Sequence, residues 1–139
     1  MAYSFNIPSS RNKLRLLRKF VTEVLNEHGV SEVETNMMVL AVDEVCANII
    51  IHGHPGTESY NVRIDIAFKN DGIQFEIIDQ GHAFDLVNYQ EPALNELIKN
   101  KHKGGIGIML VKKIMDDIHF ESTNDQNKLS LFKKVSFNA

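Results

Sequence analysis

The clearest structural pattern in the chain is residues 60–78, YNVRIDIAFKNDGIQFEII, in which apolar and polar side chains alternate on both sides of a turn. A period of two is typical of a strand with one buried face and one solvated face. Asn70-Asp71-Gly72 is a strong hairpin sequence, so the two runs predict an antiparallel pair. A sheet of this kind needs a second layer on its buried face, which the flanking sequence must supply.

Two amphipathic helices are predicted before this hairpin. Ser9 or Ser10 can cap the first helix, and Gly29 closes it. The second begins with the capping box Ser31-x-x-Glu34 and runs to about His52, where Gly53-His54-Pro55-Gly56 ends it. The apolar residues of the first helix recur at helical spacing: Leu14, Leu17, Val21, Val24 and Leu25.

The remaining segments complete an α+β pattern. Tyr3–Ile7 is predicted as an edge strand, and a third helix follows Gly104-Gly105-Ile106-Gly107. Residues 118–120 and 129–135 then predict a closing antiparallel pair. Leu86–Lys103 is a long polar stretch, and a connection of that length in a compact domain is usually a functional loop or lid. The fold class expected is a two-layer α/β sandwich over residues 1–139, a single domain with a mixed, mostly antiparallel sheet and helices on one face.

Composition narrows the class of protein. The chain has 139 residues, a net charge of −3, 43% apolar and 24% charged residues, which is ordinary for a globular domain. This charge predicts no direct binding to nucleic acid or to a membrane surface. A single cysteine, Cys46, excludes an internal disulfide, and no apolar run of eighteen residues is present. The N-terminal residues lack a basic segment followed by an apolar run, so we expect no signal peptide. We therefore expect a cytoplasmic protein in which Cys46 is a buried structural thiol.

Two carboxylate-bearing segments attract attention. Glu44, Asn48 and His52 lie four residues apart and make a polar stripe on an otherwise apolar helix. A carboxylate and a carboxamide one turn apart suit Mg²⁺, although a solvated helix face explains the same stripe. Asp79 ends a buried strand and Gly81 follows it; the carboxylate could bind an exocyclic amine, or the pair could be turn chemistry.

The third segment is Lys103-Gly104-Gly105-Ile106-Gly107, at the start of a helix. Glycines there expose backbone amides, which together with the helix dipole favour phosphate. The sequence lacks the Gly-Lys-Ser/Thr ending of a Walker A loop and the third glycine of a dinucleotide-binding fingerprint. A flexible hinge for the lid is compatible with phosphate binding.

In order and spacing, the three segments resemble the N, G1 and G2 boxes of the GHKL (Bergerat-fold, histidine-kinase-like) ATPases. The resemblance covers nearly the whole chain and rests on Glu44-x-x-x-Asn48, Asp79-x-Gly81 and Gly105-x-Gly107. It implies that ATP and Mg²⁺ are cofactors, that Asn48 ligates Mg²⁺ and that Asp79 contacts the adenine amine. The ATP-binding set implied is Asn48, Asp79, Gly81, Phe84, Lys103, Gly104, Gly105, Ile106, Gly107 and Ser130.

Ser130 enters this set through a departure from the family. Related proteins carry a Gly-Thr-rich turn in the final strand pair, where this chain has Gln126-Asn127-Lys128-Leu129-Ser130. Either Ser130 or Lys128 could take the place of the missing threonine. Asp43, beside Glu44, should point about 100° away around the helix and is expected to be structural or partner-facing.

Among GHKL proteins, the helix Leu40–Gly53 is similar to that of the anti-sigma-factor serine/threonine kinases. The similarity implies a kinase in which Glu44 is the catalytic base toward a serine or threonine of an anti-anti-sigma, STAS-domain partner. It also implies binding to a sigma factor and a homodimer. The alternative is an ATP-gated binding protein that transfers no phosphate; Glu44 favours the kinase, because a binding module would not need a base there.

Overall fold

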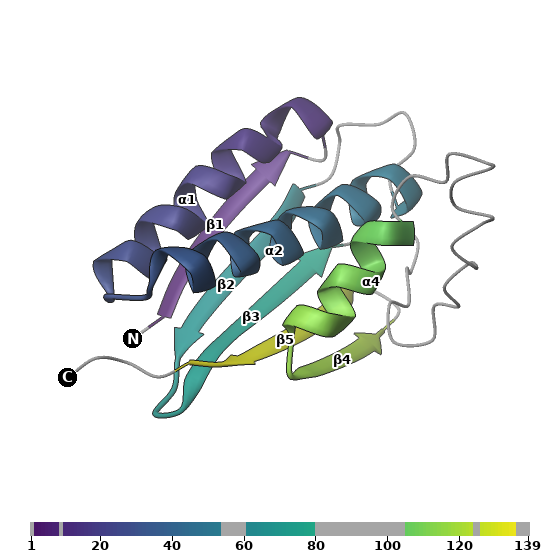
Figure 1. Ribbon diagram of the computed structural model, residues 1–139. Helices are drawn as coiled ribbons and strands as arrows, with labels where there is room; N and C mark the ends of the chain where they lie inside the picture. Colours follow the sequence, from purple (N-terminus) through teal and green to yellow (C-terminus); the bar gives the residue numbers. More distant parts are fainter. Residues whose placement is uncertain (1, 9, 54–60, 80–104, 124–125, 136–139) are drawn as a thin grey trace.

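The computed structural model describes residues 2–8, 10–53, 61–79, 105–123 and 126–135. Within these ranges one five-stranded sheet carries helices on a single face, so the chain forms two layers (Figure 1). The predicted α+β sandwich is therefore confirmed. The elements in chain order are β1 (Ala2–Pro8), a 3-10 turn η1 (Arg11–Lys13), α1 (Leu14–Glu27), α2 (Glu32–Gly53), β2 (Asn61–Phe68), β3 (Gly72–Asp79), α4 (Gly105–Ile114), β4 (Asp117–Ser122) and β5 (Asn127–Lys134).

The strands are ordered β1-β2-β3-β5-β4, and all neighbours in the described sheet are antiparallel. The parallel component of a mixed sheet is thus absent from this part of the chain. The hairpin predicted at residues 60–78 joins β2 to β3 with Phe68 opposite Ile73. Gly72 is required for packing rather than for the turn, because a Cβ there would collide with the backbone of Lys133 on β5.

The start of α1 differs from the prediction. No side-chain cap precedes it: the N-cap is Lys13, and the chain enters through η1, in which the Ser10 carbonyl accepts a hydrogen bond from the Lys13 amide. The expected serine cap is therefore wrong for Ser10, and Ser9 lies outside the described residues. The end of α1 is as predicted from Gly29. This residue has a φ of 73°, and Val30 N–H donates to the Leu25 carbonyl, as in a Schellman motif.

The capping box at the start of α2 is present. Glu34 N–H donates to Ser31 Oγ at 3.2 Å, and the Ser31 hydroxyl reaches the Glu34 carboxylate at 3.4 Å. The sharp reversal between α1 and α2 lets both helices lie on the same face of the sheet (Figure 1). None of the helices within the described ranges is long and apolar enough to span a membrane.

The core lies between the helices and the covered face of the sheet. Every second residue of the central strands is buried, including Ile64, Ile66, Phe75, Ile77 and Leu131 at 0% exposure. The alternate residues of the same strands are half-buried or exposed on the helix-free face. Which face a strand residue occupies therefore decides whether it can reach the helices, and this rule positions the candidate site.

Candidate functional site

The first part of the site is on α2. Asn48 is 4% exposed, and its Nδ2 donates to the Glu44 backbone carbonyl at 2.8 Å and to Glu44 Oε1 at 3.1 Å. Both donations fix the carboxamide, so that its Oδ1 is the atom available to bind a cation. Glu44 itself is half-buried. The predicted one-turn pairing of carboxylate and carboxamide is thus formed by direct contact.

This pair suits Mg²⁺ but does not enclose it. Both side chains offer hard oxygen ligands, which Mg²⁺ prefers. No group of three or more His, Cys, Asp or Glu side chains capable of holding a metal occurs among the described residues. Mg²⁺ usually binds one or two protein ligands and takes the remainder from water and phosphate oxygens. The donor set therefore fits a cation that arrives with a nucleotide.

The second part of the site is at the end of β3. Asp79 is 4% exposed and lies directly opposite Asn127, the first residue of β5. Asn127 Nδ2 approaches Asp79 Oδ1 at 3.4 Å, and Asn127 Oδ1 accepts a hydrogen bond of 2.7 Å from Ser122 Oγ on β4. Three strands thus contribute to one polar chain, in which Asp79 and Asn127 are buried and Ser122 is exposed. The Asp79 carboxylate can accept hydrogen bonds from a ligand amine.

Asp79 lies close to the inner side of α2. Burial raises the pKa of the Cys46 thiol strongly, and the negative charges of Asp43 and Asp79 raise it further. Cys46 is 0% exposed and stays protonated, as expected for a structural thiol rather than a nucleophile. α2 and β3 are in direct contact, so the β3 carboxylate and the α2 pair belong to one region.

The third part is the start of α4. Gly105, Ile106 and Gly107 form the first turn of this helix, so their backbone amides are at its N-terminus. Unpaired amides at a helix start favour phosphate. Figure 1 shows that the C-terminal part of α2, the end of β3 and the start of α4 gather on the same side of the molecule, at the right of the view. The predicted site residues Gly81, Phe84, Lys103 and Gly104 and the predicted lid, residues 86–103, lie outside the described residues.

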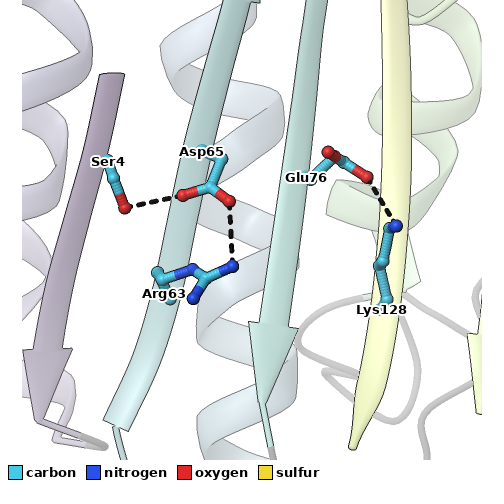
Figure 2. A network of polar contacts seen from close by, with 5 residues as sticks. All are labelled: Ser4, Arg63, Asp65, Glu76 and Lys128. Atoms are coloured by element: carbon cyan, nitrogen blue, oxygen red, sulfur yellow. Dashed lines mark hydrogen bonds and ion pairs between the residues drawn. The ribbon is translucent and has the colours of Figure 1, made fainter. Parts of the chain in front are cut away.

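Ser130 is not brought to this site. Along β5, Asn127, Leu129 and Leu131 are buried on the covered face, whereas Lys128 and Ser130 alternate onto the helix-free face. Lys128 binds Glu76 there at 2.9 Å (Figure 2), and this hydrogen bond and charge raise the pKa of Lys128. Ser130 borders a hollow of about 330 Å³ on that face, together with Gln74 and His119.

Asn127 is the residue that sequence reasoning missed. It lies within the stretch from Gln126 to Ser130, but its face of the strand depends on the register between β3 and β5. Asn127 must lie on the covered face once Asp79 does, because residues directly opposite each other on paired strands share a face. Asp43 has a structural contact, because Arg18 on α1 donates a hydrogen bond to its carboxylate at 3.0 Å.

Known proteins resemble this chain over most of its length. The model of the histidine kinase-like ATPase domain matches residues 7–133. The serine-protein kinase RsbW of Oceanobacillus iheyensis is 26% identical over 116 residues, which cover 81% of this chain and 73% of the relative. RsbW of Bacillus cereus is 24% identical, with 81% and 72% covered.

Solved structures show the same fold. The RsbU and RsbW domains of Rv1364c from Mycobacterium tuberculosis superpose with a TM-score of 0.70 at 15% identity, covering 100% of this chain and 34% of that longer one. The catalytic domain of histidine kinase ThkA gives a TM-score of 0.55 at 9% identity, with 99% of both chains covered. The arrangement of Glu44, Asn48 and Asp79 and the match over residues 7–133 lead to one conclusion: the chain belongs to the histidine kinase-like ATPase family.

Proposed function

We propose that this chain is a serine/threonine protein kinase that binds Mg·ATP and phosphorylates an anti-anti-sigma, STAS-domain protein. The observation that carries the proposal is the contact between Glu44 and Asn48, which places a half-buried carboxylate beside a cation-binding carboxamide. The serine-protein kinases RsbW, with 72–73% of their length matched, support the choice of substrate.

Each part of the site has a role in this proposal. Asp79, held by Asn127, accepts a hydrogen bond from the adenine amine, and the amides of Gly105–Gly107 receive phosphate. Asn48 Oδ1 would hold Mg²⁺, which neutralises phosphate charge when bound. Gly81, Phe84, Lys103 and Gly104 are assigned to the same nucleotide from sequence. Ser130 is proposed no longer as a phosphate contact, because its strand position faces away from Asp79.

Transfer requires little covalent chemistry from the protein. The acceptor hydroxyl oxygen forms a bond to the γ-phosphorus, the bond from that phosphorus to the β,γ-bridging oxygen breaks, and ADP leaves. Glu44 takes the hydroxyl proton, which a carboxylate within hydrogen-bond reach can do. The neighbouring Asn48 amide, donating to Glu44 Oε1 at 3.1 Å, fixes the direction of that carboxylate.

The wider setting belongs to the same proposal. The similarity to anti-sigma-factor kinases implies that the chain also binds a sigma factor, forms a homodimer and works in the cytoplasm. A single domain over residues 1–139, with residues 86–103 as a lid, is likewise proposed.

The test is transfer of labelled phosphate from Mg·ATP to purified STAS-domain proteins of the source organism. Glu44→Gln, which keeps the shape of the side chain, should lower the transfer rate about 10²–10⁴-fold while ATP still binds. Glu121→Gln, an exposed carboxylate on β4, is the matched control and should transfer normally. ATP binding without transfer by the unaltered chain would replace the kinase with an ATP-gated binding protein.

A further inference from the structure

The outer side of α2 is unusually apolar for a solvent-facing helix surface. Val33 is 69% exposed, Leu40 47% and Met37 38%. These are three of the four large apolar residues found exposed in the described part of the chain, and they recur at a spacing of four and three residues. Residues spaced in this way share one face of a helix. We call Val33, Met37 and Leu40 the α2 ridge.

No helix or strand of the described residues covers the α2 ridge. The inner side of α2 packs on the sheet, α4 packs against one flank, and α1 lies along the other, where Arg18 binds Asp43 at 3.0 Å. A surface helix normally presents charged or polar residues on the side away from the core, whereas a helix that is apolar all round is normally buried. Within the ranges that the structure describes, the α2 ridge therefore has no covering element.

Glu44 continues the line of the α2 ridge. It follows Leu40 by four residues and Val33 by eleven, and eleven residues are about three full turns, so all four residues lie along one stripe. With a rise of 1.5 Å per residue, Val33 lies about 16 Å from Glu44 along the helix axis. The exposed apolar residues are thus aligned with the proposed catalytic base.

We propose that the α2 ridge is the docking surface for the protein that receives the phosphoryl group. This inference rests on the proposed kinase function, because it assigns the substrate contact of the same site. A protein interface of standard size covers about 800 Å² on each partner, equivalent to a disc of roughly 16 Å radius. A disc centred on Glu44 covers Leu40 and Met37, about 6 and 10 Å away along the helix, and has its edge near Val33. A folded acceptor that delivers a hydroxyl to Glu44 therefore covers most of the ridge.

The partner chemistry follows from these dimensions. The acceptor protein carries a serine or threonine that meets Glu44 and an apolar patch that extends about 16 Å from it along α2. Burial of Leu40 and Val33 supplies affinity, while the pairing of hydroxyl and carboxylate supplies chemistry. The α2 ridge is therefore a specificity surface for a protein substrate, and it plays no part in ATP binding.

The experiment measures binding and phosphorylation of a purified STAS-domain protein by full-length variants. Leu40→Gln and the double variant Val33→Gln/Leu40→Gln replace exposed apolar side chains with polar residues that favour helix. We expect the Kd for the STAS-domain protein to rise about tenfold for the single variant and about a hundredfold for the double variant. KM for that protein should rise in parallel with kcat unchanged, because the bound hydroxyl still meets Glu44.

Two controls keep the outcomes separate. His119→Gln changes an exposed residue on the helix-free face and should leave Kd unchanged, and ATP affinity and urea unfolding of the α2 variants should match the unaltered chain. Unchanged Kd in the double variant overturns the docking surface but leaves the kinase intact. Loss of self-association instead of acceptor binding also overturns it, since the occupant is then a second copy. Binding without transfer by the unaltered chain overturns the kinase alone.

Discussion

The two faces of the sheet treat polar side chains differently. On the helix-free face, Ser4 Oγ donates to Asp65 at 2.6 Å, Arg63 binds the same carboxylate at 3.1 Å, and Glu76 binds Lys128 (Figure 2). These groups are partly exposed and pair with one another. On the covered face nearly every strand residue is apolar, and the buried polar residues of the strands are Asp79 and Asn127.

The face that a polar side chain occupies indicates whether it belongs to the candidate site. A polar residue on the helix-free face keeps contact with water and costs little, so its presence needs no ligand to explain it. A buried carboxylate is expensive unless it is hydrogen-bonded, and Asp79 keeps such a position beside α2. Polar groups on the covered face therefore mark the site, whereas richer polar networks on the other face do not.

The largest effect that we predict tests the structural part of the covered face. Phe75 is fully buried at the centre of β3, and Phe75→Ala should lower the free energy of unfolding by about 3–5 kcal/mol. Its chain neighbour Gln74 points to the helix-free face, so Gln74→Ala should cost well under about 1 kcal/mol. Urea denaturation of both variants checks the contrast, and similar losses would show that the faces do not differ in this way.

Asp79→Asn should produce the next largest effect, and it should appear in binding rather than in folding. The change removes the negative charge that strengthens a hydrogen bond from the adenine amine, worth about 1.5–3 kcal/mol. We expect the Kd for ATP to rise about 10–100-fold. Calorimetric titration measures this value, and Asp65→Asn on the helix-free face is the control. Equal ATP affinity in Asp79→Asn and the unaltered chain would remove Asp79 from the nucleotide site.

Much of this architecture is predictable from local sequence. The alternation in residues 60–78 requires only that a strand has two faces, and the Ser31–Glu34 capping box requires only neighbouring atoms. Glu44 and Asn48 are found equally directly, because helical spacing alone brings them into contact. The prediction failed at Ser10, since a 3-10 turn before α1 is decided by how β1 leads into the helix layer.

The placement of Asn127 and Ser130 could not be predicted in the same way. Both lie near the expected position of a family threonine, but a shift of one residue in strand register exchanges the two faces. That register is fixed by long-range pairing of Asp79 with Asn127, across 48 residues of sequence. Local patterns therefore identify the helical part of the site, whereas the strand part depends on tertiary pairing.

Two separate substitutions on β5 test this dependence on strand register, and the expected effect is smaller. Asn127→Ala removes the Nδ2 donor 3.4 Å from Asp79 and the acceptor for Ser122, so it should lower stability by about 1–2 kcal/mol and weaken ATP binding severalfold. Ser130→Ala should change neither quantity. Thermal unfolding and ATP titration of the two variants provide the measurement. Weaker ATP binding in Ser130→Ala alone would restore the serine to the phosphate site.

Thr35 is an exception to the rule that buried polar side chains mark the site. Its side chain is 2% exposed in α2, and its hydroxyl is the one buried side-chain polar atom without a hydrogen-bond partner in the described part of the chain. It lies thirteen residues, or about 20 Å of helix, from Asn48 and thus outside the site. Thr35→Val keeps the shape and should stabilise the fold by roughly 1 kcal/mol in urea, with ATP affinity unchanged. A loss of stability would mean that the hydroxyl does make a favourable contact.

The smallest expected effect on stability concerns the ion pair of Lys128 with Glu76 on the helix-free face. Lys128→Met should cost at most roughly 0.5 kcal/mol near pH 8, because both side chains are about one-third exposed, and 1 M salt should remove most of that cost. Glu76 raises the pKa of Lys128 in the folded chain, so the stabilisation is complete below the ordinary lysine pKa and is lost as the pH rises through the raised value. Urea unfolding of Lys128→Met and the unaltered chain should therefore converge in strongly alkaline buffer. A difference that persisted there, or in high salt, would mean that Lys128 stabilises the sheet by packing of its aliphatic chain rather than by charge.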